Sequence, residues 1–390
     1  MRLDANYLAD PHGFFAELRR AGPVRQAQMP NGATVWMVTR YADVYNACAD
    51  PRLSMNNEHA PGWRGLILPP QLNATLMNTD PPAHTRLRRL VSKAFTPHRV
   101  AQMRDRIQEV TDDLLDAVAP HGHADLNRAL AAPLPLTVIG EMLGIPSRHH
   151  EDFRQWLGTM LAAEAGQASP QDASTAVQNI AEFLVALVAR KADALADDLL
   201  SDMISARDAE DRLSADELTS LAFLIFSAGY ETTVSLIGNA VVALLRRPDQ
   251  WAVLIDDPAL VPNAIEEMLR FDGPSLLAVR RFAREDMEIG GARIRAQDTV
   301  MLALASANRD AGQFTSPDEV DVRRKDNKHV GFGHGIHFCL GAPLARLEGE
   351  IALATLLRRF PGLKLAVPAG ELQWRPSLRT RGTVTLPVTF

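Results

Sequence analysis

The residues best suited to chemistry lie in one short segment, from Gly331 to Arg346. It contains Cys339, one of only two cysteines in the chain, just after a run of three glycines in five residues. Glycines allow a backbone to approach another group closely or to adopt a positive φ angle. The apolar residues that follow the cysteine recur at helical spacing, which predicts a buried helix face. Free amides at the start of such a helix favour a thiolate over a thiol, so we expect Cys339 to be a soft metal ligand or a nucleophile.

Three kinds of chemistry are open to such a thiolate. A nucleophilic cysteine needs a nearby base, and His337 lies close to it in the sequence. A tetrahedral zinc site needs three or four ligands, and His334, His337 and Cys339 are too crowded for the usual spacings. The third option is a single axial thiolate on haem iron. A buried structural cysteine after a glycine-rich turn is the alternative without chemistry.

The order of residues around Cys339 favours the haem ligand. The segment resembles the haem-binding loop of the cytochrome P-450 family, which has the following pattern: Phe332-Gly333-x-Gly335-x-His337-x-Cys339-x-Gly341. The resemblance implies that Cys339 is the axial ligand of the iron of haem b. It also implies that Phe332 and Gly341 help to bind the haem and that His337 anchors a haem propionate.

A second cluster of candidate ligands lies on a helix predicted from His84 to Phe95. Its apolar residues share one arc, and His84 and Arg88 lie one turn apart beside that arc. Buried cationic groups need anionic partners. The family resemblance implies that His84 and Arg88, together with Arg281 further along the chain, bind the haem propionates. Without the cysteine loop, the same pattern is typical of an ordinary amphipathic helix.

The opposite side of this helix carries a basic ridge, which consists of Arg86, Arg89 and Lys93. Exposed charges steer diffusional encounters between proteins. We therefore expect the ridge to be a docking surface for a small acidic redox partner such as a ferredoxin. A merely solvated helix face is the alternative.

The longest predicted helix begins at a capping box formed by Ser214 and Glu217. Further along it carries the segment Ala-Gly-Tyr-Glu-Thr-Thr, residues 228–233, on a buried face. Such residues weaken a buried helix, so we expect it to open there and admit a small molecule. The segment resembles the family's oxygen-activation motif, which implies that Glu231 and Thr232 deliver protons to bound O2. An ordinary glycine kink is the alternative.

Two further regions extend the resemblance. Glu267 and Arg270 lie one helical turn apart, where the family has a buried ion pair that supports the haem loop. On its own, this spacing is typical of a surface pair. Residues after Pro274 read as strands, and residues 377–390 predict a hairpin whose turn near Thr380 reaches into the pocket.

Composition places the chain among ordinary globular proteins. Hydrophobic residues make up 46% of it and charged residues 23%, and its formal net charge is -6. Mild acidity without a basic block argues against nucleic-acid binding. The two cysteines form no disulfide framework, which favours a reducing compartment. The N terminus has no apolar segment of signal-peptide length, and no apolar run is long enough to cross a membrane.

The resemblance implies a single cytochrome P-450 domain over residues 1–390, mainly α-helical with small β-sheets (α+β) and triangular in outline. It implies a haem-thiolate monooxygenase that uses O2 to hydroxylate or epoxidise a hydrophobic substrate. The general pattern resembles bacterial enzymes of antibiotic biosynthesis that act on secondary metabolites such as polyketides and macrolides. Because no flavin or nicotinamide fingerprint is present, electrons are expected from a ferredoxin and a ferredoxin reductase. We expect a soluble, cytoplasmic protein without nucleic-acid or membrane partners.

Two other functions are compatible with the same motifs. A family member that catalyses another oxidation, such as ring coupling or desaturation, would retain every motif above. A haem-binding sensor or carrier without turnover is the other alternative. The pair formed by Glu231 and Thr232 argues against a carrier, because a carrier has no need of proton delivery.

Overall fold

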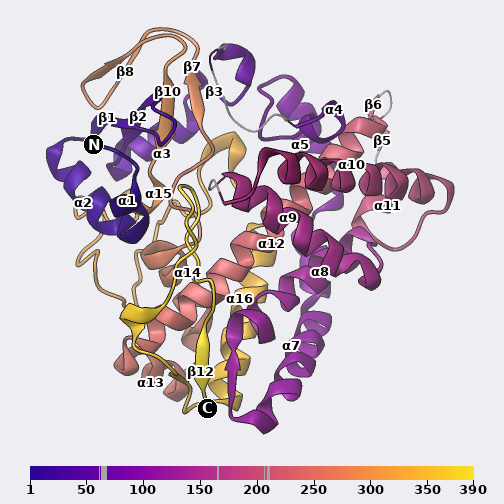
Figure 1. Ribbon diagram of the computed structural model, residues 1–390, viewed down its shortest axis with the longest axis vertical. Helices are drawn as coiled ribbons and strands as arrows, with labels where there is room; N and C mark the ends of the chain where they lie inside the picture. The colour runs from indigo at the N-terminus through magenta and orange to yellow at the C-terminus, as the bar shows by residue number, and fades with distance from the viewer. Residues whose placement is uncertain (61, 63–67, 165–166, 206, 209–210) are drawn as a thin grey trace.

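The computed structural model describes residues 1–60, 62, 68–164, 167–205, 207–208 and 211–390, with backbone alone at positions 93, 94, 161, 164, 207, 208 and 211. The molecule is mainly helical and narrows from the end with the N-terminal sheet toward the C terminus (Figure 1). Its helices are α1 (Ala5–Ala9), α2 (Pro11–Ala21), α3 (Tyr41–Ala49), α4 (Pro70–Asn73), α5 (Ala83–Ala94), α6 (Pro97–Gln102), α7 (Arg104–Val118), α8 (Pro133–Leu143), α9 (His150–Glu164), α10 (Pro170–Asp193), α11 (Leu199–Ser205), α12 (Ala215–Leu245), α13 (Pro248–Asp256), α14 (Val261–Asp272), α15 (Leu304–Ala307) and α16 (Ala342–Arg359).

Short strands form small sheets at the edges of the helical core. The strands are β1 (Val24–Gln28), β2 (Thr34–Val38), β3 (Leu53–Ser54), β4 (His123–Asp125), β5 (Arg207–Asp208), β6 (Asp211–Arg212), β7 (Arg281–Ala283), β8 (Met287–Ile289), β9 (Ala292–Ile294), β10 (Thr299–Leu302), β11 (Lys364–Leu365) and β12 (Pro387–Thr389). The largest sheet has the order β1-β2-β10-β7-β3. Strand β10 pairs with β2 in parallel and with β7 in antiparallel fashion, so this sheet fixes the strand that carries Arg281.

Helix α12 is the centre of the helical core. Ser214 and Glu217 form the predicted capping box, with both reciprocal hydrogen bonds present. The helix is apolar around most of its circumference, which requires burial on several sides. It packs against α4, α8, α10, α14 and α16, and Figure 1 shows it passing through the middle of the molecule.

The same helix has the length and composition of a membrane-crossing segment, and among the described residues it is the one helix that does. However, 61% of its most apolar window is buried inside the protein, as expected for a core helix. Packing against neighbouring helices therefore accounts for its apolar composition.

The C-terminal segment departs from its predicted form. A hairpin-like pairing does occur, but it joins Trp374 to Thr383 and begins before the predicted start at residue 377. The last residues form β12, which pairs instead with β4 and β11. The alternation of residues reflects two different pairings in succession. The turn of the first pairing, which includes Thr380, lines the central cavity as predicted.

Candidate functional site

Cys339 lies on a tight loop directly before α16, as predicted. Gly333 and Gly335 have φ angles of 72° and 76°, which favour glycine. A Cβ atom on Gly335 would lie 3.0 Å from Cα of Ala49, so the loop packs closely against the end of α3. The Cys339 amide donates a hydrogen bond to the Phe332 carbonyl at 3.0 Å, which closes the loop. Helix α16 then buries the predicted apolar residues Leu344, Leu347 and Ile351.

A buried ion pair on α14 supports this loop. The side chains of Glu267 and Arg270 are both 0% exposed and are joined by two hydrogen bonds of 2.7 and 2.8 Å. Arg270 also donates to the Asn308 carbonyl at 3.0 Å. The Asn308 side chain in turn accepts a hydrogen bond of 2.8 Å from the Val330 amide at the start of the loop. The prediction that this is a buried pair rather than a surface pair is confirmed.

A second carboxylate, which the sequence analysis missed, links α14 to α16. Glu266 accepts hydrogen bonds from Arg346 at 2.6 and 2.9 Å and lies 3.1 Å from His329. The Arg346 guanidinium lies 4.7 Å from the centre of the Phe332 ring. Burial raises the pKa of Glu266, but bonds from His329 and Arg346 outweigh it and lower the pKa to about 2. The one available sequence signal was Arg346, about two helical turns after the cysteine.

The Cys339 thiol lines the central cavity. The side chain is exposed to this cavity. Desolvation by the surrounding protein atoms raises the pKa of the thiol, and the Gly341 and Ala342 amides and Arg88 act in the opposite direction. The expectation that the start of α16 favours its thiolate stays a prediction. Among the described residues, His337 makes no hydrogen bond to the thiol, so the pair does not form an activated nucleophile. A bound metal cation would deprotonate such a thiol, which favours a ligand role.

Positive charge is concentrated beside the thiol. The rings of His84 and His337 lie 4.3 Å apart, and neither nitrogen of the buried His84 ring has a hydrogen-bond partner. Arg281 is 4% exposed and donates to the Val279 carbonyl at 2.7 Å. Arg88 is half-buried, and within the described chain no carboxylate forms an ion pair with either of these arginines.

The pKa shifts in this cluster have a common cause. Burial, followed by the charges of Arg281, His84 and Arg88, lowers the pKa of His337 to about 3. Burial and Arg88 lower the pKa of His84 as well, against a smaller opposing effect of Asp80. Both histidines are therefore neutral near pH 7, and the positive charge of the cluster lies on Arg88 and Arg281. The cluster therefore fits an anionic ligand that enters beside Cys339.

Glu231 and Thr232 lie on the cavity side of α12, but the predicted opening of the helix is wrong. The helix is continuous from Ala215 to Leu245. The Thr232 hydroxyl donates to the Ala228 carbonyl at 2.5 Å, as many helical threonines do, and this bond leaves the helix intact. Gly229 instead allows close packing, because a Cβ atom there would lie 2.8 Å from the tip of Ile139 on α8.

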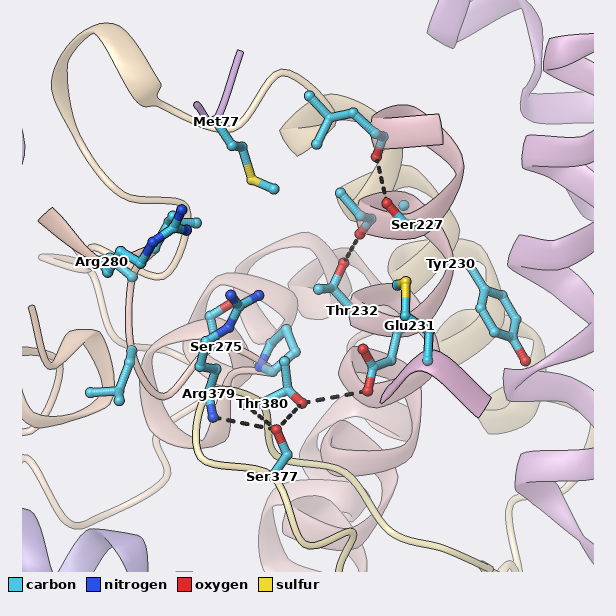
Figure 2. A pocket seen from close by; sticks show the side chains of 18 of the residues that line it. Met77, Ser227, Tyr230, Glu231, Thr232, Ser275, Arg280, Ser377, Arg379 and Thr380 are labelled. Atoms are coloured by element: carbon cyan, nitrogen blue, oxygen red, sulfur yellow. Dashed lines mark hydrogen bonds between the residues drawn. The ribbon is translucent and has the colours of Figure 1, made fainter. Parts of the chain in front are cut away.

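Polar groups connect Glu231 to the C-terminal hairpin. The Thr380 hydroxyl lies 3.4 Å from a Glu231 carboxylate oxygen and 2.9 Å from the Ser377 hydroxyl. Arg375 lies 3.8 Å from the same carboxylate oxygen. Figure 2 shows this series of oxygen atoms running from α12 to the hairpin. Such a series can carry protons between Glu231 and the surface of the pocket.

The cavity that these residues share has a volume of about 2580 Å³. This exceeds the roughly 300–1,000 Å³ of a typical small-molecule site, so it has room for a large cofactor together with a substrate. Its walls come from distant segments, including α9, α10, α12 and the hairpin around Thr380. Residues 101–205 supply Met160 and Val177 to the wall. Residues 55–82 also contribute, and within that range positions 61 and 63–67 lie outside the described residues.

The predicted basic ridge is only partly supported. Arg86 forms an ion pair of 2.6 Å with Glu217 at the start of α12 and is one-third exposed, so it is not simply solvated. Arg89 is exposed. The side chain of Lys93 lies outside the described part of the structure.

Comparisons with known proteins agree with this geometry. Residues 166–365 match the family described as Cytochrome P450. Cytochrome P450 107B1 of Saccharopolyspora erythraea is 42% identical and is matched over 100% of this chain and 97% of its own length. The 6-deoxyerythronolide B hydroxylase of the same organism is also 42% identical, over 98% of this chain and 96% of that protein.

A solved structure, the tirandamycin C-bound P450 monooxygenase TamI, superposes with a TM-score of 0.90 at 41% identity. It covers 100% of this chain and 99% of that one. Likeness of this degree in sequence and in structure, over the whole chain, shows common ancestry and a common fold. The chain therefore belongs to the cytochrome P450 family and is a monooxygenase, one of the oxidoreductases.

Proposed function

We propose that Cys339 is the axial ligand of a haem b iron and that His84, Arg88, Arg281 and His337 hold the two haem propionates. The supporting observation is the buried positive cluster beside the thiol, in which His84 has two ring nitrogens without partners. Propionates would supply both the missing negative charge and hydrogen-bond acceptors. When bound, haem activates O2 and inserts one of its oxygen atoms into a C–H or C=C bond of the substrate. Phe332 and Gly341 line the same cavity and would contact the haem.

The protein's own residues have three tasks in this reaction. The thiolate of Cys339 would hold the iron and supply electron density to it. Thr232 and Glu231 move protons on the cavity side of α12, Glu231 through its contact with Thr380 and Thr232 through a hydroxyl that can both accept and donate a hydrogen bond. The apolar walls exclude water and orient the substrate.

The proposed substrate is a hydrophobic secondary metabolite of the polyketide or macrolide type, as in antibiotic biosynthesis. Two observations support this proposal: the volume of the cavity, and relatives named for the hydroxylation of 6-deoxyerythronolide B and for binding tirandamycin C. The proposed electron donors are a ferredoxin and a ferredoxin reductase, and the proposed location is the cytoplasm. These follow from the family and from the lack of a flavin or nicotinamide fingerprint in the sequence.

Absorption spectroscopy of the reduced carbon monoxide complex tests the ligand assignment. Thiolate ligation should give the red-shifted Soret band that marks this class of haem protein. Cys339→His should abolish that band while the cavity retains haem. A parent spectrum typical of histidine-ligated haem would overturn the assignment.

Other oxidations, such as ring coupling or desaturation, remain alternative reactions for the same site, and product analysis distinguishes them. The sensor or carrier alternative is disfavoured by the monooxygenase relatives. Reductant-driven oxygen uptake with a bound substrate would separate turnover from simple binding.

A further inference from the structure

The cavity wall that faces α12 carries arginines that proton delivery and haem binding do not use. Arg280 directly precedes β7, and Arg379 lies in the turn of the C-terminal hairpin; both line the cavity. Figure 2 shows their guanidinium groups on the same side of the pocket, across from Thr232. We propose that this wall, with Arg379 as the main contact, binds a carboxylate group of the substrate.

The backbone of Arg379 is held firmly in place. Its carbonyl accepts a hydrogen bond of 2.8 Å from the Leu276 amide, and its amide donates to the Ser377 hydroxyl at 3.3 Å. The adjacent Thr380 pairs with Ser275 as an isolated β-bridge. The turn is thus held against residues 275–276 of the same chain. The Arg379 side chain extends from this fixed backbone into the cavity. Ligand binding then has to order only the rotamers of this side chain and not the backbone of the turn.

The charges on this wall favour an anion. Among the described residues, Arg379 forms no ion pair and no side-chain hydrogen bond. The carboxylate of Glu231 on α12 contacts Thr380 and Arg375. Arg280 donates hydrogen bonds to the amide oxygens of Asn57 and Asn78, which carry no charge. The guanidinium of Arg379 can therefore bind an anionic group of a ligand.

The charge of Arg379 would make the cavity selective for substrates that carry a carboxylate. An organic molecule that fills the cavity removes water from Arg379, and the loss of its water destabilises an isolated charge. A carboxylate removes this penalty, because it accepts two parallel hydrogen bonds from one guanidinium. The apolar body of the substrate would lie along α10 and α12, where Val177, Leu221 and Leu224 line the cavity.

The position of the anchor also orients the substrate. Thr380, next to Arg379, lies 3.4 Å from Glu231, so the carboxylate end would lie on the wall beside the proton-delivery pair. This inference rests on the proposed function only in that an organic substrate occupies the cavity. The carbon monoxide spectrum tests the haem assignment independently, so failure of one does not imply failure of the other.

Matched acids and esters provide the test. The haem-loaded protein is titrated with dodecanoic acid and methyl dodecanoate, and with abietic acid and its methyl ester, by equilibrium dialysis and by the Soret shift. We expect at least one acid to bind about tenfold or more tightly than its ester, the ratio that a charge-assisted hydrogen bond of roughly 1.5–3 kcal/mol gives. If neither acid binds more tightly than its ester, the proposal fails.

Substitutions locate the effect. Arg379→Ala should weaken acid binding by about 10- to 100-fold and leave ester binding within about threefold. Arg379→Lys should retain part of the preference, and Arg379→Glu should reverse it. Arg293→Ala serves as the matched control, because Arg293 is 83% exposed on β9 and does not line the cavity. Equal weakening of acid and ester by Arg379→Ala would overturn the proposal, since it would indicate a structural role.

Discussion

Thr232 illustrates how one hydroxyl group can have both a structural and a catalytic role. Its hydrogen bond to the Ala228 carbonyl is the ordinary helical bond. The same oxygen keeps lone pairs that can accept a further hydrogen bond within the cavity. Geometry alone therefore does not choose between the two roles, and the distinction must come from where the protons go during turnover.

Thr232→Ala makes this distinction. If the hydroxyl directs protons, the variant should still consume oxygen and reductant, while product falls and hydrogen peroxide rises. If the hydroxyl is only structural, coupling should stay intact and stability alone should change. The measurement is peroxide against product per molecule of reductant, with Thr232→Ser as the conservative control that should restore coupling.

A substrate with its own well-placed hydroxyl gives a third outcome for the same variant. Full coupling of Thr232→Ala with that substrate alone would show that the substrate supplies the proton route. Full coupling with substrates that lack such a hydroxyl would contradict the role of Thr232.

At the scale of elements, α14 determines the position of the cysteine loop. Its two adjacent glutamates contact different parts of that region. Glu267 binds Arg270, which in turn donates to the Asn308 carbonyl. Glu266 binds His329 before the loop and Arg346 on α16. Both sets of contacts use the charge of a carboxylate away from bulk water. The loss of either should therefore affect the retention of haem.

Glu267→Ala should lower the free energy of unfolding by about 3–5 kcal/mol, because it leaves the buried charge of Arg270 without its partner. The variant should fail to fold or should lose haem. The matched control is Glu141→Ala, which removes a half-exposed ion pair with Arg106 and should cost about 0–1 kcal/mol. Denaturant unfolding and haem content measure both, and normal haem content in Glu267→Ala would contradict the structural role.

Glu266→Gln should change the pH dependence of stability. The folded pKa of Glu266 is about 2, below its ordinary value of 4.5. A lowered pKa stabilises the folded state above the unfolded value, and this contribution is lost as the pH falls toward the folded value. At pH 7 the variant should therefore be less stable than the parent, by an amount of order 3 kcal/mol.

The difference between the Glu266 variant and the parent should shrink below about pH 4.5. Thermal unfolding at pH 7, 5, 4 and 3.5 measures it. Glu288→Gln on β8, an exposed position, controls for the loss of one charge. A difference that stays constant over this range would show that the stabilisation does not depend on the ionised carboxylate.

At the scale of the whole molecule, the proposed ferredoxin must dock on the surface outside the cavity to deliver electrons. The predicted docking ridge lies on α5, whose other face presents His84 and Arg88 to the cavity. The ion pair between Arg86 and Glu217 changes the design of the test, because neutralising Arg86 would also disturb the start of α12. The other two residues of the ridge are the better targets.

Arg89→Gln combined with Lys93→Gln should slow reduction by ferredoxin at low salt and leave substrate affinity unchanged. Salt should reduce the difference, since screening weakens electrostatic steering. Stopped-flow reduction at two ionic strengths provides the measurement. Equal rates for variant and parent at low salt would show that this helix face is merely solvated.

The sequence by itself determined the loop that carries the candidate ligand and the start of the longest helix. Cys339 after its glycine run, the capping box at Ser214, and the spacing of Glu267 and Arg270 are local patterns, and local patterns carry their own physical signal. They predicted the start of α12 and the turn before α16, whereas the burial of the pair on α14 came from the family resemblance. The family resemblance added the haem and its propionate contacts, which remain proposals for this chain.

The tertiary structure decided what depends on contacts between distant segments. Desolvation by the surrounding segments opposes the expected lowering of the Cys339 pKa, and α12 remains continuous through the turn that carries Thr232. Glu266 contacts Arg346, and Arg379 lines the cavity, because folding brings separate helices and the C-terminal hairpin together. Helix and strand periodicity reports which face of an element is buried, but it does not report which charges meet there, because desolvation and pairing depend on all the elements that surround a group.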